Sequence, residues 1–236
     1  MIAENLQRVH TRITQACLGA GRPSGSVQLL AVSKTFGAEA VAQAYAGGQI
    51  AFGENYIQEA VGKITELAHL PLEWHCIGPI QSNKTRLVAE HFQWVHTVDR
   101  LKIAQRLSEQ RPSHLPPLNI CIQVNVDGGD TKSGVLPQEA LALAQAVALL
   151  PHLKLRGLMC IPEPAPDFIA SLAVFTGAKG LFDAICEGGV QLDTLSMGMS
   201  ADLEAAVHGG STMVRVGSAI FGARSYSADV IFPAHA

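Results

Sequence analysis

Residues 27–54 read VQLLAVSKTFGAEAVAQAYAGGQIAFGE and contain a complete strand–helix–strand unit. The apolar run at 27–33 predicts a buried strand that stops at Lys34. Residues 38–46 are rich in alanine, and the two glycines that follow them end the predicted helix. A second apolar run occupies residues 50–53. Buried strands that alternate with single helices are typical of a parallel sheet with right-handed crossovers.

The same unit recurs along the rest of the chain. Further strand-like runs lie at residues 74–77, 94–98, 118–126, 153–161, 192–197 and 213–216. Helical patterns lie at residues 56–70, 82–92, 101–109, 137–149, 167–187 and 200–207, and one more precedes the first strand at residues 6–16. Eight such units close naturally into a barrel. We therefore predict an α/β fold, a single (β/α)8 TIM barrel with an extra N-terminal helix, as one domain over residues 1–236.

An open, doubly wound sheet is the alternative arrangement of these units. That arrangement would carry a dinucleotide fingerprint, and G-x-G-x-x-G is absent from the sequence. H-E-x-x-H, G-x-x-x-x-G-K-[ST] and C-x-x-C are absent as well. The stretch 198–202 lacks the last glycine of G-x-S-x-G. The motifs thus favour the barrel and predict no metal site.

Composition excludes some classes of binding partner and predicts the cellular compartment. The chain is 48% hydrophobic and carries a net charge of −3, so it is neither a disordered chain nor a basic nucleic-acid binder. The absence of a run of 18 or more apolar residues predicts no membrane partner. The N-terminus has no signal-peptide pattern, and the five cysteines are odd in number and scattered. We expect a reduced, cytoplasmic protein and, without a readable apolar patch, a monomer.

Lys34 is the most informative residue for chemistry. Active sites of such barrels lie at the carboxyl ends of the strands, where this lysine stands. A partly desolvated amine there is a nucleophile toward aldehydes and forms a Schiff base. The alternative interpretation is a solvated lysine beyond the end of the strand.

Small polar residues follow the seventh and eighth predicted strands, where barrels commonly bind phosphate. They are Ser200, predicted as the N-cap of a helix, and the pair Gly217 and Ser218. Plain capping and a tight turn would explain them equally well. Arg215 lies inside the eighth run and needs a partner there, either a ligand or Glu204 on the outer side.

His75 and His96 are the histidines at strand positions, and His75 is a candidate ligand contact. Residues 127–134 form a glycine-rich polar loop that contains Lys132 and suits an anion nest, a lid or an ordinary turn.

A lysine after strand one combined with a phosphate site after strands seven and eight suits pyridoxal 5′-phosphate, which has both an aldehyde and a phosphate. The sequence resembles the pyridoxal phosphate homeostasis protein family, single-barrel relatives of the alanine racemase N-terminal domain. The resemblance spans nearly the full chain. Its motifs are AVSK (31–34), FGENYIQE (52–59), WHCIGPIQSNK (74–84), VN (124–125), KSG (132–134), GLM (157–159), SMGMSAD (196–202) and VRVGSAIFG (214–222).

The resemblance implies a role for each candidate site residue. Lys34 would hold the cofactor, and Arg215 would face its pyridine nitrogen. Asn55 and Met199 would lie close to the ring. The phosphate would be bound by Ser200, Gly217 and Ser218. Lys132 resembles a family lysine with a second role in cofactor transfer, whereas residues 160–163 and the tail after Arg224 match the family pattern least well.

The resemblance also implies a function in intracellular vitamin B6 homeostasis, with indirect effects on amino-acid and keto-acid pools and no established turnover. Its implied partners are pyridoxal 5′-phosphate, other B6 vitamers and apoenzymes that accept the cofactor. The alternatives are a cofactor-dependent racemase and, from the residues alone, a Schiff-base aldolase. A two-base racemase needs an opposing base, and Tyr45, Tyr56 and Tyr226 are not obvious candidates. Eight units fill nearly all 236 residues, so we expect no room for the further domain of related racemases.

Overall fold

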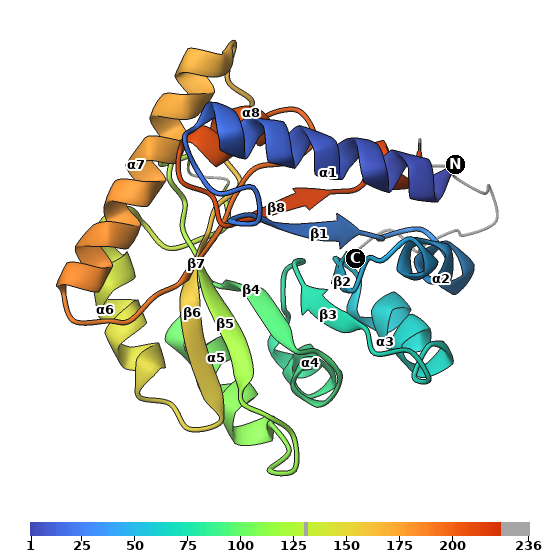
Figure 1. The fold of residues 1–236 in the computed structure, drawn as a ribbon. Coiled ribbons are helices and arrows are strands. Elements are labelled where there is room, and N and C mark those ends of the chain that lie inside the picture. Colours follow the sequence, from blue (N-terminus) through green and yellow to red (C-terminus); the bar gives the residue numbers. More distant parts are fainter. Residues whose placement is uncertain (130–131, 223–236) are drawn as a thin grey trace.

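Eight parallel strands close into a barrel in the computed structural model, which describes residues 1–129 and 132–222 (Figure 1). Each strand pairs with the next one along the chain, and β8 pairs with β1. The strands are β1 (Gln28–Val32), β2 (Ala51–Glu54), β3 (Glu73–Cys76), β4 (Trp94–Val98), β5 (Leu118–Gln123), β6 (Leu153–Met159), β7 (Thr194–Ser196) and β8 (Met213–Val216). The predicted (β/α)8 barrel is confirmed.

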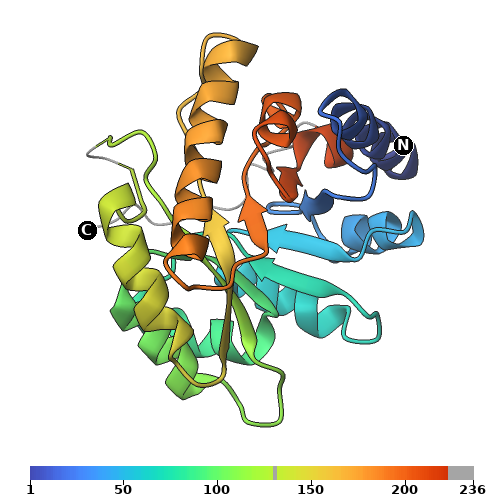
Figure 2. The same cartoon turned by 60° about the vertical axis from the view of Figure 1, so that its left-hand side comes forward.

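The helices cover the outside of the barrel between successive strands (Figure 2). They are α2 (Ala38–Ala46), α3 (Ile57–Glu66), the short η1 (Ser82–Lys84) with α4 (Thr85–His91), α5 (Leu101–Gln110), α6 (Pro137–Ala148), α7 (Phe168–Glu187), α8 (Leu203–His208) and α9 (Ser218–Phe221). The predicted extra helix is α1 (Ile2–Gly19), which packs against α2, α8 and α9. Its Leu6, Val9 and Ile13 are buried because they recur on one face.

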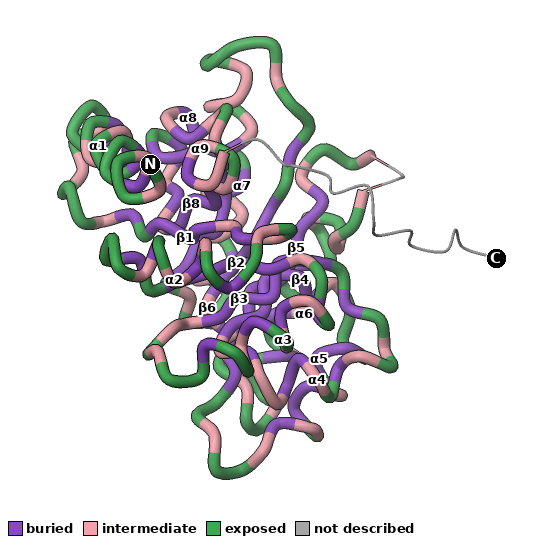
Figure 3. The backbone as a smooth tube through the Cα atoms, turned by 90° about the vertical axis from the view of Figure 1, so that its right-hand side faces the viewer, coloured by how far each residue is buried: buried purple, intermediate pink, exposed green. Residues whose placement is uncertain are grey.

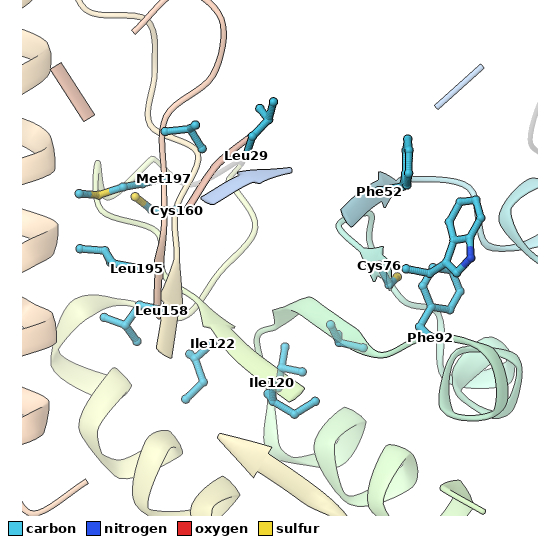
Figure 4. Packing of buried hydrophobic residues seen from close by; sticks show 14 of the residues in the cluster. Leu29, Phe52, Cys76, Phe92, Ile120, Ile122, Leu158, Cys160, Leu195 and Met197 are labelled. Atoms are coloured by element: carbon cyan, nitrogen blue, oxygen red, sulfur yellow. The ribbon is translucent and has the colours of Figure 1, made fainter. Parts of the chain in front are cut away.

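Side chains alternate between the two faces of each strand, so the barrel has two packing layers. The outer layer lies between the strands and the helices and is apolar; Figure 4 shows part of it, with Phe52, Ile122 and Leu195 among its members. Figure 3 shows the strands as the most continuously buried part of the chain and the helices as mixed. The inner layer contains Leu30 and Met213 but also several polar side chains, which are described below.

Some predicted element boundaries are wrong, and local hydrogen bonds explain one of them. The strand predicted at 118–126 ends at Gln123, because Asn125 turns the chain by bonding the backbone of Gly128 and Gly129 at 3.1 and 2.9 Å. The helix predicted from residue 200 begins at Leu203. The prediction that residues 1–236 form one domain reaches beyond the described residues and stays a prediction.

Within the described residues, α7 alone is long and apolar enough to pass a length-and-composition test for crossing a membrane. In the barrel it packs against α6 and α8, with Phe175, Ala178 and Ile185 buried. Lys179 and Asp183 pair with each other on the same helix at 2.6 Å. A single helix of this kind is weak evidence for a membrane span.

Candidate functional site

A cavity of about 290 Å³ opens at the carboxyl ends of the strands. It is bounded by residues that follow β1, β2, β3, β6, β7 and β8, so both halves of the chain contribute to it. Its walls contain all seven predicted site residues: Lys34, Asn55, Met199, Ser200, Arg215, Gly217 and Ser218. Val32, Ile77, Ile161 and Ala201 complete the lining. The parallel strand order brings these residues together, because all carboxyl ends meet on one face.

Lys34 lies in a sharp turn directly after β1 and is partly buried. Ser33 donates its hydroxyl hydrogen to Glu54 Oε1 over 2.6 Å, which ties this turn to the end of β2. The next residue, Thr35, has a φ of +69°, a left-handed conformation that is uncommon for a residue with a side chain. Its backbone N–H donates to Glu59 Oε1 over 2.9 Å. Residues on both sides of Lys34 are therefore held by carboxylates.

A buried lysine organises those carboxylates. Lys63 Nζ lies 2.7 Å from Glu54 Oε1, 2.6 Å from Glu59 Oε1 and 2.8 Å from the carbonyl oxygen of Ser33. Its side chain is only 6% exposed, so both of its charge partners are needed to offset the loss of hydration. Burial raises the pKa of Glu54, and the Lys63 ammonium opposes that rise. This cluster fixes the turn that presents Lys34, and we did not predict it from the sequence.

The turns after β7 and β8 bring small residues to the cavity. Gly198 has a φ of +95°, and a Cβ there would overlap that of Ala206, so only glycine fits. A Cβ on Gly217 would lie 3.0 Å from the carbonyl oxygen of Val32, which makes this a close approach of two backbones. Ser218 is the first residue of α9, so its backbone N–H has no partner within that helix.

Ser200 is not the N-cap that the sequence predicts. Asp202 occupies the N-cap position of α8, and its Oδ1 accepts the backbone N–H of Met199 over 2.6 Å. Ser200 lies in the turn before it, where Arg12 of α1 donates to its carbonyl oxygen over 3.1 Å. Arg12 also pairs with Glu204 at 2.9 Å. The extra N-terminal helix thus supports this wall of the cavity, a role that we did not predict.

Arg215 points into the barrel, so its predicted alternative, an outer salt bridge to Glu204, is wrong. Its side chain is buried and donates from Nη1 to the carbonyl oxygen and the hydroxyl of Ser196, each over 2.8 Å. Nη2 donates to the carbonyl oxygen of Cys160 over 2.9 Å. Burial raises the pKa of the Cys160 thiol to about 12, so this neighbour is neutral. The guanidinium brings a positive charge to the floor of the cavity.

Of the remaining predicted contacts, Asn55 and Met199 line the cavity and His75 does not. Asn55 is partly buried, and its Oδ1 is buried without a hydrogen-bond partner among the described residues, although the residue lines the cavity. Met199 is 38% exposed at the rim. His75, a candidate ligand contact, lies deep in the barrel and does not line the cavity in the described part of the chain.

Lys132 lies beside the rim of the cavity. Its Nζ is 2.9 Å from Glu163 Oε1 and 3.5 Å from the carbonyl oxygen of Ile161, which is itself a wall residue. The loop after β5 therefore contacts the segment after β6, which is one of the two stretches that fit the family pattern poorly. The other stretch, the tail after Arg224, lies outside the described residues, and so does Tyr226.

Comparisons with known proteins agree with this barrel. A family model, the alanine racemase N-terminal domain, matches residues 2–225. A pyridoxal phosphate homeostasis protein of Pseudomonas aeruginosa is 61% identical over 227 residues, which are 96% of this chain and 97% of that protein. The Escherichia coli protein of the same name is 53% identical over 229 residues, with 96% of this chain and 98% of that protein covered.

Solved structures give the same picture. PipY of Synechococcus elongatus, solved with pyridoxal phosphate bound, is 38% identical with a TM-score of 0.80 and covers 94% of this chain and all of its own. An alanine racemase from Corynebacterium glutamicum shares the fold at 17% identity and a TM-score of 0.69, over 96% of this chain and 61% of that one. The chain belongs to the pyridoxal phosphate homeostasis protein family, built on the barrel of the alanine racemase N-terminal domain.

Proposed function

We propose that this protein binds pyridoxal 5′-phosphate in the cavity, through a Schiff base on Lys34, and takes part in intracellular vitamin B6 homeostasis. The observation that carries the proposal is the meeting of a lysine, two small-residue turns and a buried arginine around one cavity. The relatives bear the corresponding name, and PipY has been solved with this cofactor. An effect on amino-acid and keto-acid pools would follow indirectly from the supply of the cofactor.

The residues present fit this group chemically. Asn55 Oδ1 is a buried acceptor that has no partner among the described residues, so a donor from a ligand would satisfy it. Val32 and Ile77 offer apolar walls for a ring. Ser218 and the close backbone approach at Gly217 suit an anion, because backbone N–H groups can reach it there.

Each residue then has a separate task. Lys34 would hold the aldehyde carbon, and Arg215 would donate toward the ring nitrogen and keep that nitrogen without a proton. Ser200, Gly217 and Ser218 would bind the phosphate, with Asn55 and Met199 beside the ring. When bound, pyridoxal phosphate supplies a reactive carbonyl and an electron-withdrawing ring. A cation opposite the ring nitrogen weakens that withdrawal, which favours storage or delivery of the cofactor over turnover.

A cofactor-dependent racemase is the alternative. It would need a second base opposite Lys34. Tyr56 is 57% exposed, and neither it nor Tyr45 on α2 lines the cavity in the described residues. We therefore favour a carrier or regulatory protein. Its further partners would be other B6 vitamers and apoenzymes that accept the cofactor, and neither nucleic acid nor membrane; it would act as a soluble, cytoplasmic monomer.

Borohydride trapping tests the proposal. The protein as purified, or after addition of pyridoxal 5′-phosphate, is reduced, digested and analysed by mass spectrometry, and we expect the phosphopyridoxyl mass on Lys34. Lys34→Ala should lose both the adduct and the visible absorbance band of the cofactor. Lys132→Ala is the matched control and should keep them. An adduct of sugar mass would support the aldolase instead, and sustained amino-acid turnover would support the racemase.

A further inference from the structure

A chain of hydrogen-bonded side chains runs through the barrel interior to the cavity. His75 Nε2 lies 2.9 Å from Glu73 Oε1, and His75 Nδ1 lies 2.9 Å from His96 Nε2. His96 Nδ1 lies 3.0 Å from Ser196 Oγ, which accepts from Arg215 Nη1 over 2.8 Å. The chain begins at Glu73, 37% exposed at the amino end of β3, and ends at Arg215 on the cavity floor.

These groups occupy positions that aliphatic side chains usually fill in such barrels. His75, His96 and Ser196 are completely buried, and Trp94 stacks on the His75 ring with 5.2 Å between centroids. Buried polar groups destabilise a fold unless each is hydrogen-bonded. Here every ring nitrogen and the hydroxyl has a partner.

The two ends of the chain determine where every proton lies. The Glu73 carboxylate only accepts, because its hydrogen bond with His75 holds its pKa below the ordinary value. His75 must then donate from Nε2. Burial lowers the pKa of His75 and, further, that of His96, so both rings are neutral and carry one N–H each. His75 Nδ1 therefore accepts from His96 Nε2–H.

The same elimination applies from the other end. Arg215 is a donor only, so the Ser196 hydroxyl accepts from Nη1 and has its own hydrogen to give. His96 Nδ1, which carries no hydrogen, receives it. Every bond in the chain thus points away from Arg215 and toward Glu73. Chains aligned in this way polarise one another and strengthen each bond.

Arg215 has no carboxylate at ion-pair distance among the described residues. Its direct acceptors are Ser196 and the carbonyl oxygen of Cys160. We propose that Glu73, His75, His96 and Ser196 form a positioning relay, which places a remote carboxylate in hydrogen-bonded series with Arg215 and fixes the direction of its guanidinium. That the guanidinium meets the ring nitrogen of a cofactor rests on the proposed function; the relay itself does not.

The first test needs no cofactor. Nitrogen-15 NMR of histidine-labelled protein distinguishes the two tautomers, and we expect His75 and His96 as neutral Nε2–H rings at about pH 7. Glu73→Gln should disturb this pattern, because its amide both donates and accepts. Glu66→Gln, an exposed acid at the end of α3, is the matched control and should leave both rings unchanged. A charged ring or an Nδ1–H tautomer in the wild-type protein would overturn the relay.

The second test measures positioning. We expect Glu73→Gln and Ser196→Ala to shift the absorbance band of bound pyridoxal 5′-phosphate and to weaken its affinity about threefold to tenfold, with Glu66→Gln unchanged. Unchanged spectra and affinities in both variants would mean that the chain only fills the barrel, which contradicts the proposal. If the wild-type protein binds no cofactor, the proposed function fails, and the NMR measurement still decides whether the relay exists.

Discussion

Two buried cations, Lys63 and Arg215, lie close to the cavity and differ in their hydrogen-bond partners. Lys63 contacts two carboxylates directly, those of Glu54 and Glu59, at 2.7 and 2.6 Å. Arg215 donates to neutral acceptors of Ser196 and Cys160. Both side chains are nearly excluded from solvent, so the difference lies in their partners and not in their burial.

The difference in partners means that the charge of Lys63 stabilises the fold, whereas the charge of Arg215 can act on a ligand in the cavity. Opposite charges in contact cancel much of each other's field, so Lys63 contributes order and little potential to the cavity. Its hydrogen bonds and ion pairs hold the turn that presents Lys34. Arg215 keeps its charge uncancelled at close range, and its field therefore acts on whatever enters the cavity. Substitution of each cation distinguishes the two roles. Loss of a structural cation should lower mainly the free energy of unfolding, and loss of a ligand-binding cation should weaken mainly ligand binding.

Removal of Lys63 should have the largest effect on stability. In Lys63→Met, Glu54 is left as an uncompensated buried carboxylate, and we expect the free energy of unfolding to fall by about 3–5 kcal/mol. Chemical denaturation of the protein without cofactor measures this. Lys63→Arg, which keeps the charge, should recover part of the loss. A loss below about 1 kcal/mol, the range of exposed ion pairs, would contradict the role of the cluster.

Removal of Arg215 should destabilise the fold less. Arg215→Met leaves three acceptors without their donor, but it also removes a buried charge that has no adjacent carboxylate, so we expect a loss of about 1–2 kcal/mol. Binding of pyridoxal 5′-phosphate should suffer more than the fold, and titration of the folded variant measures it. A loss of stability as large as that of Lys63→Met would show that Arg215 stabilises the fold as much as Lys63 does, and it would contradict the distinction between them.

The sequence predicted one half of this comparison and not the other. Arg215 was a candidate because a charged residue inside an apolar strand run is unusual and is visible in a single stretch. Lys63 looks ordinary, since Glu59 and Lys63 form a common i, i+4 pair on a helix. Its burial depends on how α3 packs against the ends of β1 and β2. A lysine on the same face as the buried Ile57 and Ala60 was the available signal.

The fold was predictable for a related reason. Strand–helix alternation can be recognised from short stretches of sequence. Parallel strands then bring residues that follow them, such as Lys34 and Ser218, to one face of the barrel. Element ends were less predictable, because side-chain hydrogen bonds such as those of Asn125 after β5 set them. The contact between His96 and Ser196 spans 100 residues and depends on which face of each strand points inward. Barrel closure decides that, so composition and spacing could not reveal it.

Acidification should affect the two regions in opposite directions. Burial lowers the pKa of His75 and His96, so the unfolded chain binds more protons than the folded one below their ordinary value of 6.5. Stability therefore decreases as the pH falls through the ordinary histidine value, with both rings contributing in the same direction. The lowered pKa of Glu73 extends the loss below its ordinary 4.5. The raised pKa of Glu54, next to Lys63, acts with the opposite sign.

Comparison of variants isolates the histidine contribution, because Glu54 is common to all of them. The free energy of unfolding is measured against pH for the wild-type protein, for His75→Gln and for His114→Gln, which removes an exposed histidine. We expect a shallower slope in His75→Gln only. Equal slopes in the three proteins would mean that folding does not hold the His75 ring neutral, which would contradict its contribution to the pH dependence.

An exposed cation gives the smallest expected effect and calibrates the comparison. Lys179 on α7 lies 2.6 Å from Asp183, as close as Lys63 is to Glu59, but its side chain is 40% exposed. Water solvates both charges whether or not they pair, so Lys179→Ala should change the free energy of unfolding by about 0.3–0.5 kcal/mol. Denaturation at low and high salt checks this, because screening should remove most of so small a term. If Lys179→Ala costs as much as Lys63→Met, burial is not what makes Lys63 structural, and contact distance alone would have to explain both.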